Sequence, residues 1–371
     1  MPTVKGTAGN DTWTVISGGT YVVDGLAGID TLNLGTSSRA EYVVHALSDG
    51  GIQIDTVSGA SSAFHATLYN MEKLTFDNNR DTISLEVGTA SAETIAGTAG
   101  DDLISGLAGD DLLSGGTGND SIDGGVGYDT VTFGSNLSNF KVQRVGITTT
   151  VDAKTGKEGS DEITNAESLK FNDMTVNLTI KGVVANAPAA NVQKVVELYI
   201  AFFKRVPDAD GMAYWIGQMS AGKTVNQIAD AFYNAGLAFP ELTGFTPQLT
   251  NTDFVNLIYR NVLGRTDGAD AEGLAYWTGK LADGSATKGS LVTDILNSAH
   301  SFKGNATFGW VADLLDNKIT VGKTFAINMG LGYVNNNDAI QHGMEIAAAI
   351  TPTNTSTAIG LIGVSAADIV L

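Results

Sequence analysis

A nine-residue repeat between residues 97 and 132 constrains the fold of this chain more than any other feature. Four copies follow one another without a gap, with the sequences GTAGDDLIS, GLAGDDLLS, GGTGNDSID and GGVGYDTVT. Each copy has glycine at positions 1 and 4, aspartate at position 6 and an aliphatic residue at position 8. Self-similarity at a fixed period is typical of stacked repeat proteins, so we expect a solenoid here rather than a flexible acidic linker.

The spacing within the repeat predicts how the chain winds. Glycine permits tight, left-handed turns, while the residues around position 8 form a short strand with an inward-pointing aliphatic side chain. Two nonamers then complete one coil, so that the loops of copies n and n+2 stack on one edge. This stacking brings Asp102 near Asp120 and Asp111 near Asp129. Such carboxylates repel one another unless a cation lies between them.

Calcium is the cation that suits this edge best. It is a hard ion that takes about six to eight oxygen ligands, which two carboxylates and the carbonyl groups of two stacked loops can supply. Magnesium demands a smaller octahedron and holds its water more tightly. Each nonamer buries only one aliphatic side chain, which is too little to fold the repeat by itself. The free energy of calcium binding should therefore drive folding, and we expect the metal-free repeat to be disordered.

The predicted calcium ligands fall into two principal sites, Asp102/Asp120 and Asp111/Asp129. A degenerate copy at 88–96 has Glu93 at its sixth position, which suggests a third site with Asp111. The loop residues predicted to surround these sites are Gly97, Ala99, Gly100, Gly106, Ala108, Gly109, Gly115, Gly116, Thr117, Gly118, Gly124, Gly125 and Gly127. We expect Asp101 and Asp110, at position 5, to face solvent.

The nonamers belong to a module that occurs twice. Residues 6–14 and 25–33 fit the same template, and their sixth-position residues Asp11 and Asp30 could form a further site. Each glycine-rich run is followed by a similar strand-like tail, at 66–79 and at 162–176. We therefore predict β modules over residues 1–87 and 88–182.

Beyond a linker of small residues at 183–191, the periodicity becomes helical. Residues 198–219 and 258–281 are two copies of one pattern, with matching tyrosine, arginine, glycine and Tyr-Trp positions. We predict a duplicated helical domain over 192–305 and a helical tail over 306–371. The expected fold class is a multidomain β + α protein, in which parallel β-roll or β-solenoid modules with calcium precede an all-α domain.

The helical copies contain acidic loops, PDADG at 207–211 and TDGADAEG at 266–273. They could bind further calcium, but we favour helix N-caps, because acids suit the positive end of a helix. Arg205 and Arg265 are expected to brace these loops. The pairs at 214–215 and 276–277 are expected to pack in a core rather than to stack on sugars.

Composition narrows the classes of partner. The net charge is −19, which disfavours nucleic acid and anionic membranes and favours metal cations. The chain has no cysteine, which excludes disulfides and thiolate metal sites. No apolar stretch is long enough to span a membrane, and residues 1–10 lack the basic start and apolar core of a signal peptide.

The phased GGxGxD pattern resembles the repeats-in-toxin (RTX) family, whose parallel β-roll binds calcium. The resemblance implies export by a type I secretion system with an uncleaved C-terminal signal, and the chain ends with Asp368, Ile369, Val370 and Leu371. The pattern LY…R-x-PD-x-x-G-x-x-YW, at 198–215 and 258–277, resembles a domain of unknown function found in bacterial surface and S-layer-like proteins.

Together these features predict a secreted, non-enzymatic calcium-binding protein of the cell surface, an S-layer-like assembly, an adhesin or a biofilm matrix. Its expected partners are calcium ions, the type I secretion machinery, and either further copies of itself or a cell-surface polysaccharide. An extracellular enzyme acting on polysaccharide or protein and a secreted toxin are the alternatives. The sequence has no HExxH or GxSxG motif that would indicate a catalytic class.

Overall fold

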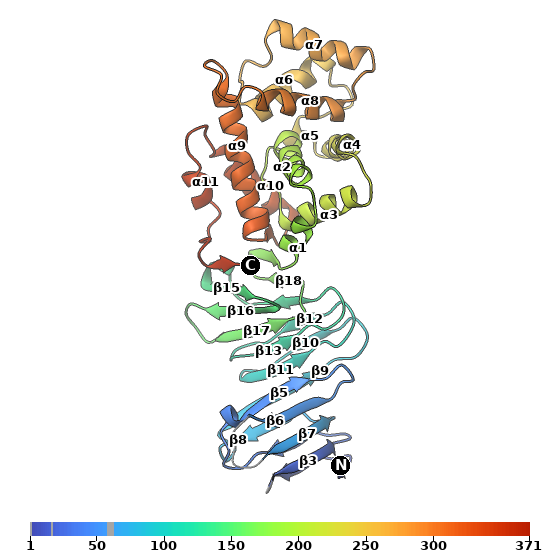
Figure 1. Cartoon of the computed structure of the whole chain (residues 1–371), viewed down its shortest axis with the longest axis vertical. Coiled ribbons are helices and arrows are strands. Elements are labelled where there is room, and N and C mark those ends of the chain that lie inside the picture. Colours follow the sequence, from blue (N-terminus) through green and yellow to red (C-terminus); the bar gives the residue numbers. More distant parts are fainter. Residues whose placement is uncertain (1, 16–17, 58–62) are drawn as a thin grey trace. The chain divides into compact units, whose positions relative to one another are not determined.

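The computed structural model describes residues 2–15, 18–57 and 63–371 (Figure 1). The chain divides into two compact units, Met1–Asn172 with Asp368–Leu371, and Asp173–Ala367. The first unit ends at Asn172 rather than at 182. The expected division between 87 and 88 falls inside one sheet, because the strand Asp81–Val87 pairs with the strand Asp101–Ser105.

The first unit consists of short strands with two 3-10 helices. Its described elements are β1 (Thr3–Lys5), β2 (Thr12–Thr14), β3 (Gly19–Asp24), β4 (Thr31–Asn33), η1 (Arg39–Glu41), β5 (Tyr42–Ala46), β6 (Ile52–Thr56), β7 (Phe64–Tyr69), β8 (Lys73–Phe76), β9 (Asp81–Val87), β10 (Thr94–Ala96), β11 (Asp101–Ser105), β12 (Leu112–Ser114), β13 (Ser121–Asp123), β14 (Thr130–Thr132), η2 (Leu137–Asn139), β15 (Phe140–Val145), β16 (Thr148–Ala153), β17 (Ser160–Thr164), β18 (Ser168–Lys170) and β21 (Ile369–Val370).

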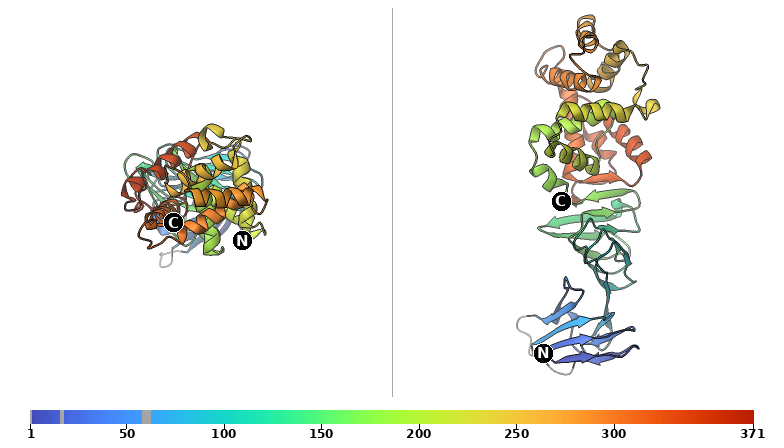
Figure 2. Two further views of the ribbon diagram at one scale, coloured as in Figure 1. Left: turned by 90° about the horizontal axis from the view of Figure 1, so that it is seen from above. Right: turned by 90° about the vertical axis from the view of Figure 1, so that its right-hand side faces the viewer.

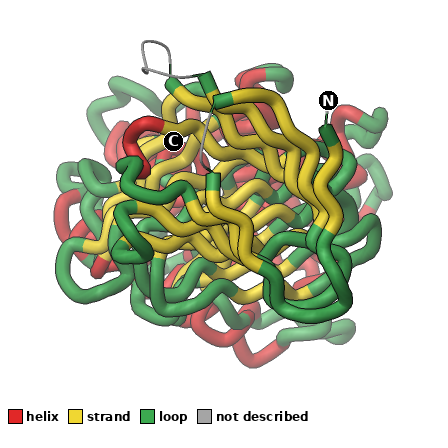
Figure 3. Tube along the Cα trace, turned by 90° about the horizontal axis from the view of Figure 1, so that it is seen from below, coloured by secondary structure: helices red, strands yellow, loops and turns green. Residues whose placement is uncertain are grey.

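Alternate nonamers pair in parallel, as the nine-residue spacing predicts. β11 pairs with β13, which places Ile104 beside Ile122, and β12 pairs with β14, which places Leu113 beside Val131. The strands thus alternate between two sheets, one containing β9-β11-β13-β17 and the other β10-β12-β14-β18. Figure 3 shows these strands stacked behind one another, and in the right-hand view of Figure 2 the strands of this unit lie as successive rungs.

The aliphatic residues at position 8 form the core of the repeat. Ile104, Leu113, Ile122 and Val131 are each at most 1% exposed. Aromatic side chains extend this core beyond the last nonamer, where the ring of Phe171 stacks on that of Phe133 with centroids 4.8 Å apart. The nonamers bury only one aliphatic residue each, and the aromatic residues after the last nonamer add a larger hydrophobic core.

The predicted duplication is visible in the two tails. An antiparallel set, β5-β6-β7, follows the first glycine-rich run, and an equivalent set, β15-β16-β17, follows the second. A turn after each set contains an asparagine in the left-handed region, Asn70 at φ 51° and Asn165 at φ 49°. Asparagine tolerates this conformation better than most residues, which explains its place in both turns.

The second unit is mainly helical. Its elements are β19 (Met174–Asn177), α1 (Ile180–Ala185), α2 (Ala189–Phe203), α3 (Ala209–Ser220), α4 (Val225–Gly236), α5 (Pro240–Thr243), α6 (Asn251–Leu263), α7 (Ala271–Ala282), α8 (Lys288–His300), α9 (Gly309–Lys323), the π-helix η3 (Thr324–Asn328), β20 (Leu331–Tyr333), α10 (Asn336–Ala348) and α11 (Ser356–Gly360). A capping box of Thr224 and Gln227 begins α4, which ends at Gly236.

Two expectations for this unit need correction. The unit is not purely helical, because β19 and β20 form an antiparallel pair in which Val176 lies opposite Leu331. The segment 183–191 is largely helical rather than a linker of small residues, because α1 runs to Ala185 and α2 begins at Ala189, directly after its N-cap Pro188. Within the described part of the chain, none of the helices is both long and apolar enough to cross a lipid bilayer.

Candidate calcium sites

The position-6 aspartates form a ladder along one edge of each stack. The backbone amide of Asp102 donates to Oδ1 of Asp120 at 3.0 Å, and that of Asp111 donates to Oδ1 of Asp129 at 2.8 Å. All four residues are at most 2% exposed. The structure therefore brings together the members of both principal pairs, each carboxylate reaching one coil back along the stack.

The second oxygen of several of these carboxylates has no partner. Oδ2 of Asp111, Asp120 and Asp129 is buried without a hydrogen-bond donor among the described residues, and the same holds for Asp30 in the first module. A buried, unpaired carboxylate oxygen is costly, because it has lost water and gained nothing in return. These atoms mark places where a cation would supply the missing partner.

Carboxylates at the start of a stack are bound differently. Both oxygens of Asp102 accept bonds from Thr98, from its amide nitrogen at 2.7 Å and from its hydroxyl at 2.9 Å. Threonine at position 2 closes the turn in the same way for two other predicted ligands, Asp11 with Thr7 and Glu93 with Thr89. Each carboxylate oxygen has a second lone pair, so these residues keep some capacity to bind a cation.

The position-1 glycines keep open the space in which the oxygens converge. A Cβ at Gly106 would lie 2.4 Å from the carbonyl oxygen of Gly124 and 2.5 Å from Oδ2 of Asp111. A Cβ at Gly97 would lie 2.4 Å from the carbonyl oxygen of Gly115 and 2.5 Å from an oxygen of Asp102. The predicted glycines Gly115 and Gly124 are equally crowded by Asp120 and Asp129. A carboxylate oxygen and a carbonyl oxygen from the next coil thus face the same small space, which fits a hard cation.

The other loop glycines let stacked loops approach closely. Gly118 has φ 134°, and a Cβ there would lie 2.4 Å from the carbonyl oxygen of Gly100. The same crowding and positive φ occur at Gly109, Gly116, Gly125 and Gly127. Gly100 differs, since a Cβ there would meet open space. Among the predicted non-glycine loop residues, Ala108 bridges to Val126, Thr117 is half-buried and Ala99 is exposed.

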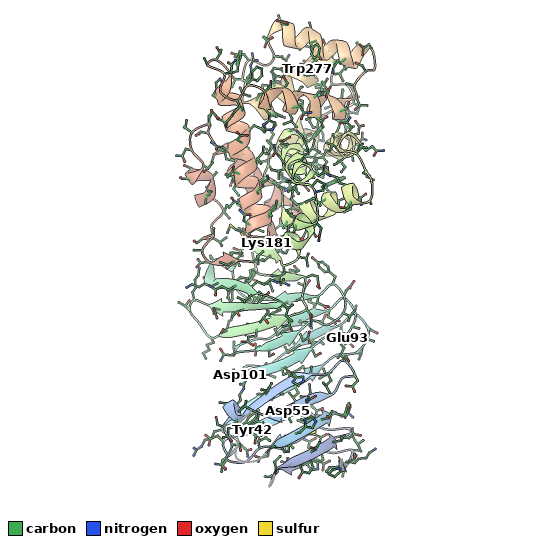
Figure 4. The ribbon with its side chains drawn as sticks, in the orientation of Figure 1. Tyr42, Asp55, Glu93, Asp101, Lys181 and Trp277 are labelled. Carbon is green, nitrogen blue, oxygen red and sulfur yellow. The ribbon has the colours of Figure 1, made fainter. Side chains whose placement is uncertain are left out.

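The position-5 residues form a second ladder that sequence reasoning missed. Oδ1 of Asp101 accepts a bond of 2.8 Å from the amide of Asn119, and Oδ1 of Asp110 accepts one of 2.8 Å from the amide of Tyr128. Asp110 is exposed as expected, but Asp101 is half-buried and also forms an ion pair with Arg39. Figure 4 labels Asp101 and Glu93 on the first unit. The expectation of solvent-facing charge therefore holds for Asp110 but only partly for Asp101.

Three further carboxylates extend the position-6 ladder beyond the nonamers. Oδ1 of Asp161 accepts from the amide of Asp120 at 3.0 Å, and Oε2 of Glu167 accepts from the amide of Asp129 at 2.9 Å. In the first module, the amide of Asp11 donates to Asp30, whose own amide donates to Glu72. Glu72 and Glu167 occupy matching places in the two tails. That match was the only feature of the sequence that could have indicated their place in the ladder.

Burial and like charge raise the pKa values of these acids. Burial raises the pKa of Asp161 to about 8, with a contribution from Asp120, and the pKa of Asp120 and of Asp129 to about 6. Glu86 on β9 has a pKa raised to about 7 by burial and by Asp102 and Asp120, and its Oε2 has no partner. The edge thus holds more negative charge than it can stabilise without a counter-ion.

No group of three or more histidine, aspartate or glutamate side chains gathers around one point in the residues that the structure describes. The donor set is instead one or two carboxylates with loop carbonyls. Calcium tolerates such a set because it takes backbone carbonyls as readily as carboxylates.

The acidic loops of the helical unit are N-caps, as predicted. Oδ1 of Asp208 accepts from the amide of Gly211 at 2.6 Å, and Asp270 accepts from the amide of Gly273 at 2.9 Å. Arg205 pairs with Asp208 at 3.0 Å, and the equivalent Arg265 pairs with Asp270 at 3.1 Å.

The Tyr-Trp pairs are only partly in the core. Trp277 is 7% exposed and donates from Nε1 to the hydroxyl of Tyr259 at 2.8 Å. Tyr214 and Tyr276, however, are 57% and 56% exposed. Core packing thus accounts for Trp277, whereas the two tyrosines need another explanation.

Comparisons with known proteins agree with both halves of this description. The model for the RTX calcium-binding nonapeptide repeat (4 copies) matches residues 87–122 and 96–131. The model for a domain of unknown function, DUF4214, matches residues 187–236 and 240–304. None of the curated proteins matches the chain.

Among solved structures, the crystal structure of extracellular lipase LipA from Serratia marcescens is 11% identical, with a TM-score of 0.17. The alignment covers 45% of this chain and 38% of the lipase, so the chain spans well under half of that protein, and the likeness carries no argument. The chain therefore contains RTX calcium-binding nonapeptide repeats joined to a DUF4214 domain.

Proposed function

We propose that this chain is a secreted protein whose first unit folds around calcium after type I export, and that it serves as a non-enzymatic component of a cell surface or extracellular matrix. The observation that carries the proposal is the row of buried, unpartnered carboxylate oxygens on Asp111, Asp120 and Asp129. Each faces a space that a glycine keeps free, and beside Asp111 and Asp129 a backbone carbonyl oxygen, of Gly124 and of Asn165, faces the same space.

Calcium would relieve three unfavourable terms at once. It would pair the buried oxygens, offset the burial and the like-charge repulsion that raise the pKa values of Asp120 and Asp129, and bind the loop carbonyls. A compartment with millimolar calcium would then favour the folded first unit. Inside a cell, where free calcium is far lower, the same chain would stay less ordered and suitable for export.

The direct test is calcium titration of the whole chain. Isothermal titration calorimetry should show several bound ions per chain, and circular dichroism should show strand signal that is lost on adding a chelator. A first unit that keeps its full strand signal in chelator at neutral or higher pH would contradict the proposal. For the export step, a reporter fused to about the last 60 residues should leave the cell only through a type I system.

The surface role is separable from calcium binding. Light scattering that increases with calcium would support self-association of the chain into an assembly. Hydrolysis of members of a polysaccharide or protein panel would instead support the alternative of an extracellular enzyme. The acidic, cysteine-free composition suits either form of extracellular protein, so the decision depends on these two measurements.

A further inference from the structure

A cavity of about 530 Å³ lies within the second helical repeat, between α6, α7, α8 and the start of α9. Its volume is in the range of sites that hold small molecules. Rings form much of its wall, including Tyr259, Trp277 and Phe308, and the exposed ring of Tyr276 also lines it. Trp277, labelled in Figure 4, lies on α7 and lines this cavity.

Three polar side chains, Arg265, Asp270 and Glu272, line the same cavity. Arg265 donates from Nη1 to Asp270 at 3.1 Å and lies between the rings of Tyr259 and Phe308, 5.4 and 5.2 Å from their centroids. The remaining N–H groups of its guanidinium have no acceptor among the described residues. Glu272 is exposed and equally without a donor there. The cavity therefore offers donors, acceptors and flat apolar rings together.

This combination selects one class of ligand. An apolar molecule would leave the remaining N–H groups of Arg265 and the carboxylate of Glu272 without partners, and an anion would meet the carboxylates of Asp270 and Glu272. A cation would meet Arg265. A neutral sugar ring has an apolar C–H face for the rings and hydroxyl groups that both donate and accept. We propose that the second repeat binds a neutral sugar in this cavity, with Tyr276 as the stacking platform.

The first repeat supplies an internal comparison. Its cavity, of about 560 Å³, is lined by Arg205 and Asp208 but not by Tyr214. Arg205 donates to Asp208 from both Nη atoms and to the carbonyl of Val206. Asp210, at the place of Glu272, accepts a bond of 2.7 Å from Asn177. The polar groups of this repeat are thus largely used internally, and its exposed tyrosine does not line this cavity.

The inference deepens the proposed surface role, because a sugar site would attach the helical unit to a polysaccharide. The test uses the full chain in calcium with glucose, galactose, N-acetylglucosamine and their disaccharides at millimolar concentration. Saturation-transfer difference NMR should show transfer to ring C–H protons of at least one sugar. The Tyr276→Ala and Glu272→Gln variants should bind that sugar about tenfold more weakly.

The matched control is Tyr214→Ala, which removes an equally exposed tyrosine from the first repeat and should leave sugar binding unchanged. Absence of transfer to every sugar, or equal loss in Tyr214→Ala and Tyr276→Ala, would overturn the inference. Binding of indole as an apolar probe, without binding of any sugar, would also overturn it. Intact sugar binding without calcium-dependent assembly would contradict the proposed function alone.

Discussion

The amide nitrogen of Asp111 donates a 2.8 Å hydrogen bond to Oδ1 of Asp129, eighteen residues later, while Oδ2 of Asp129 stays buried and unpaired. One oxygen of the carboxylate therefore fixes the register of two stacked coils, and the other is left for a ligand. Because the two oxygens have different roles, the site can be tested by substitutions that change only one of them.

Replacing Asp129 with asparagine should weaken calcium binding at this site while keeping the register of the two coils. The amide oxygen can still accept the bond from Asp111, but the NH₂ group replaces the open oxygen and repels a cation. We expect binding at this site to weaken about tenfold or more, measured by calorimetry. Asp110→Asn is the control, because Asp110 needs only its Oδ1 for the bond to Tyr128. Unchanged stoichiometry and affinity in Asp129→Asn would rule out the assigned ligand.

Alanine at Gly106 should disrupt folding, whereas alanine at Gly100 should not. The new Cβ at Gly106 would lie 2.4 Å from a backbone carbonyl and 2.5 Å from Asp111 Oδ2, but at Gly100 it would meet nothing within 4 Å. Overpacking of this kind costs about 1–3 kcal/mol and here also fills the space for the ion. Thermal melts in calcium compare the two variants, and equal melting temperatures would refute the assignment.

The metal-free chain should lose order as the pH rises. Asp161, with a pKa of about 8, and Asp120 and Asp129, with pKa values of about 6, hold protons in the folded state that they would release on unfolding, since the ordinary value is 3.8. The stability that these acids contribute is therefore fully present below pH 3.8, the ordinary pKa of aspartate. It is lost as the pH rises through their folded-state pKa values of about 6 and about 8. Circular dichroism in chelator should show more strand at pH ~5 than at pH ~8.5. Saturating calcium should remove this loss, and greater order of the metal-free chain at high pH would contradict the account.

Removal of the cap at Asp208 should destabilise the helical unit. Asp208→Ala deletes both the bond to the amide of Gly211 and the ion pair with Arg205, so we expect a loss of about 1–2 kcal/mol. Asp208→Asn keeps the cap and should lose less. Asp267→Ala, in the exposed part of the equivalent loop, should have no effect on the melting temperature. Similar losses in all three variants would show that the cap is not the cause.

Strand β21 should contribute to the stability of the first unit. Ile369 is 3% exposed and lies opposite Val142 of β15, whereas its neighbour Val370 is 47% exposed. Ile369→Ala should cost about 2 kcal/mol, and Val370→Ala much less. Chemical denaturation in calcium, followed by strand signal, measures both. A loss that is equal for the two residues would mean that the strand is not docked as described.

The sequence predicted most of what depends on strict spacing. The nine-residue phase determined that Ile104 pairs with Ile122 and that Asp102 lies beside Asp120, because every intervening residue belongs to a regular coil. The caps at Asp208 and Asp270 were equally predictable, since they depend on contacts three residues away.

Features that depend on irregular spacing were missed. Asp161 joins the ladder 41 residues after Asp120, and Glu167 joins it 38 residues after Asp129, because the β15–β16 hairpin intervenes. No periodicity connects such residues. The position-5 ladder was missed for another reason, since a carboxylate that accepts a backbone amide at the surface has the same local sequence as one that faces water.

Strand β21 has a consequence for the order of assembly. It pairs with β15, yet the whole helical unit separates the two strands in the chain, so that unit is an insertion into the first. The edge of β15 stays incomplete until polypeptide from both sides of the insertion is in the same compartment. That edge therefore stays open until the helical unit and the strand that follows it have both been made, so this sheet closes only after residues 369–370 are available.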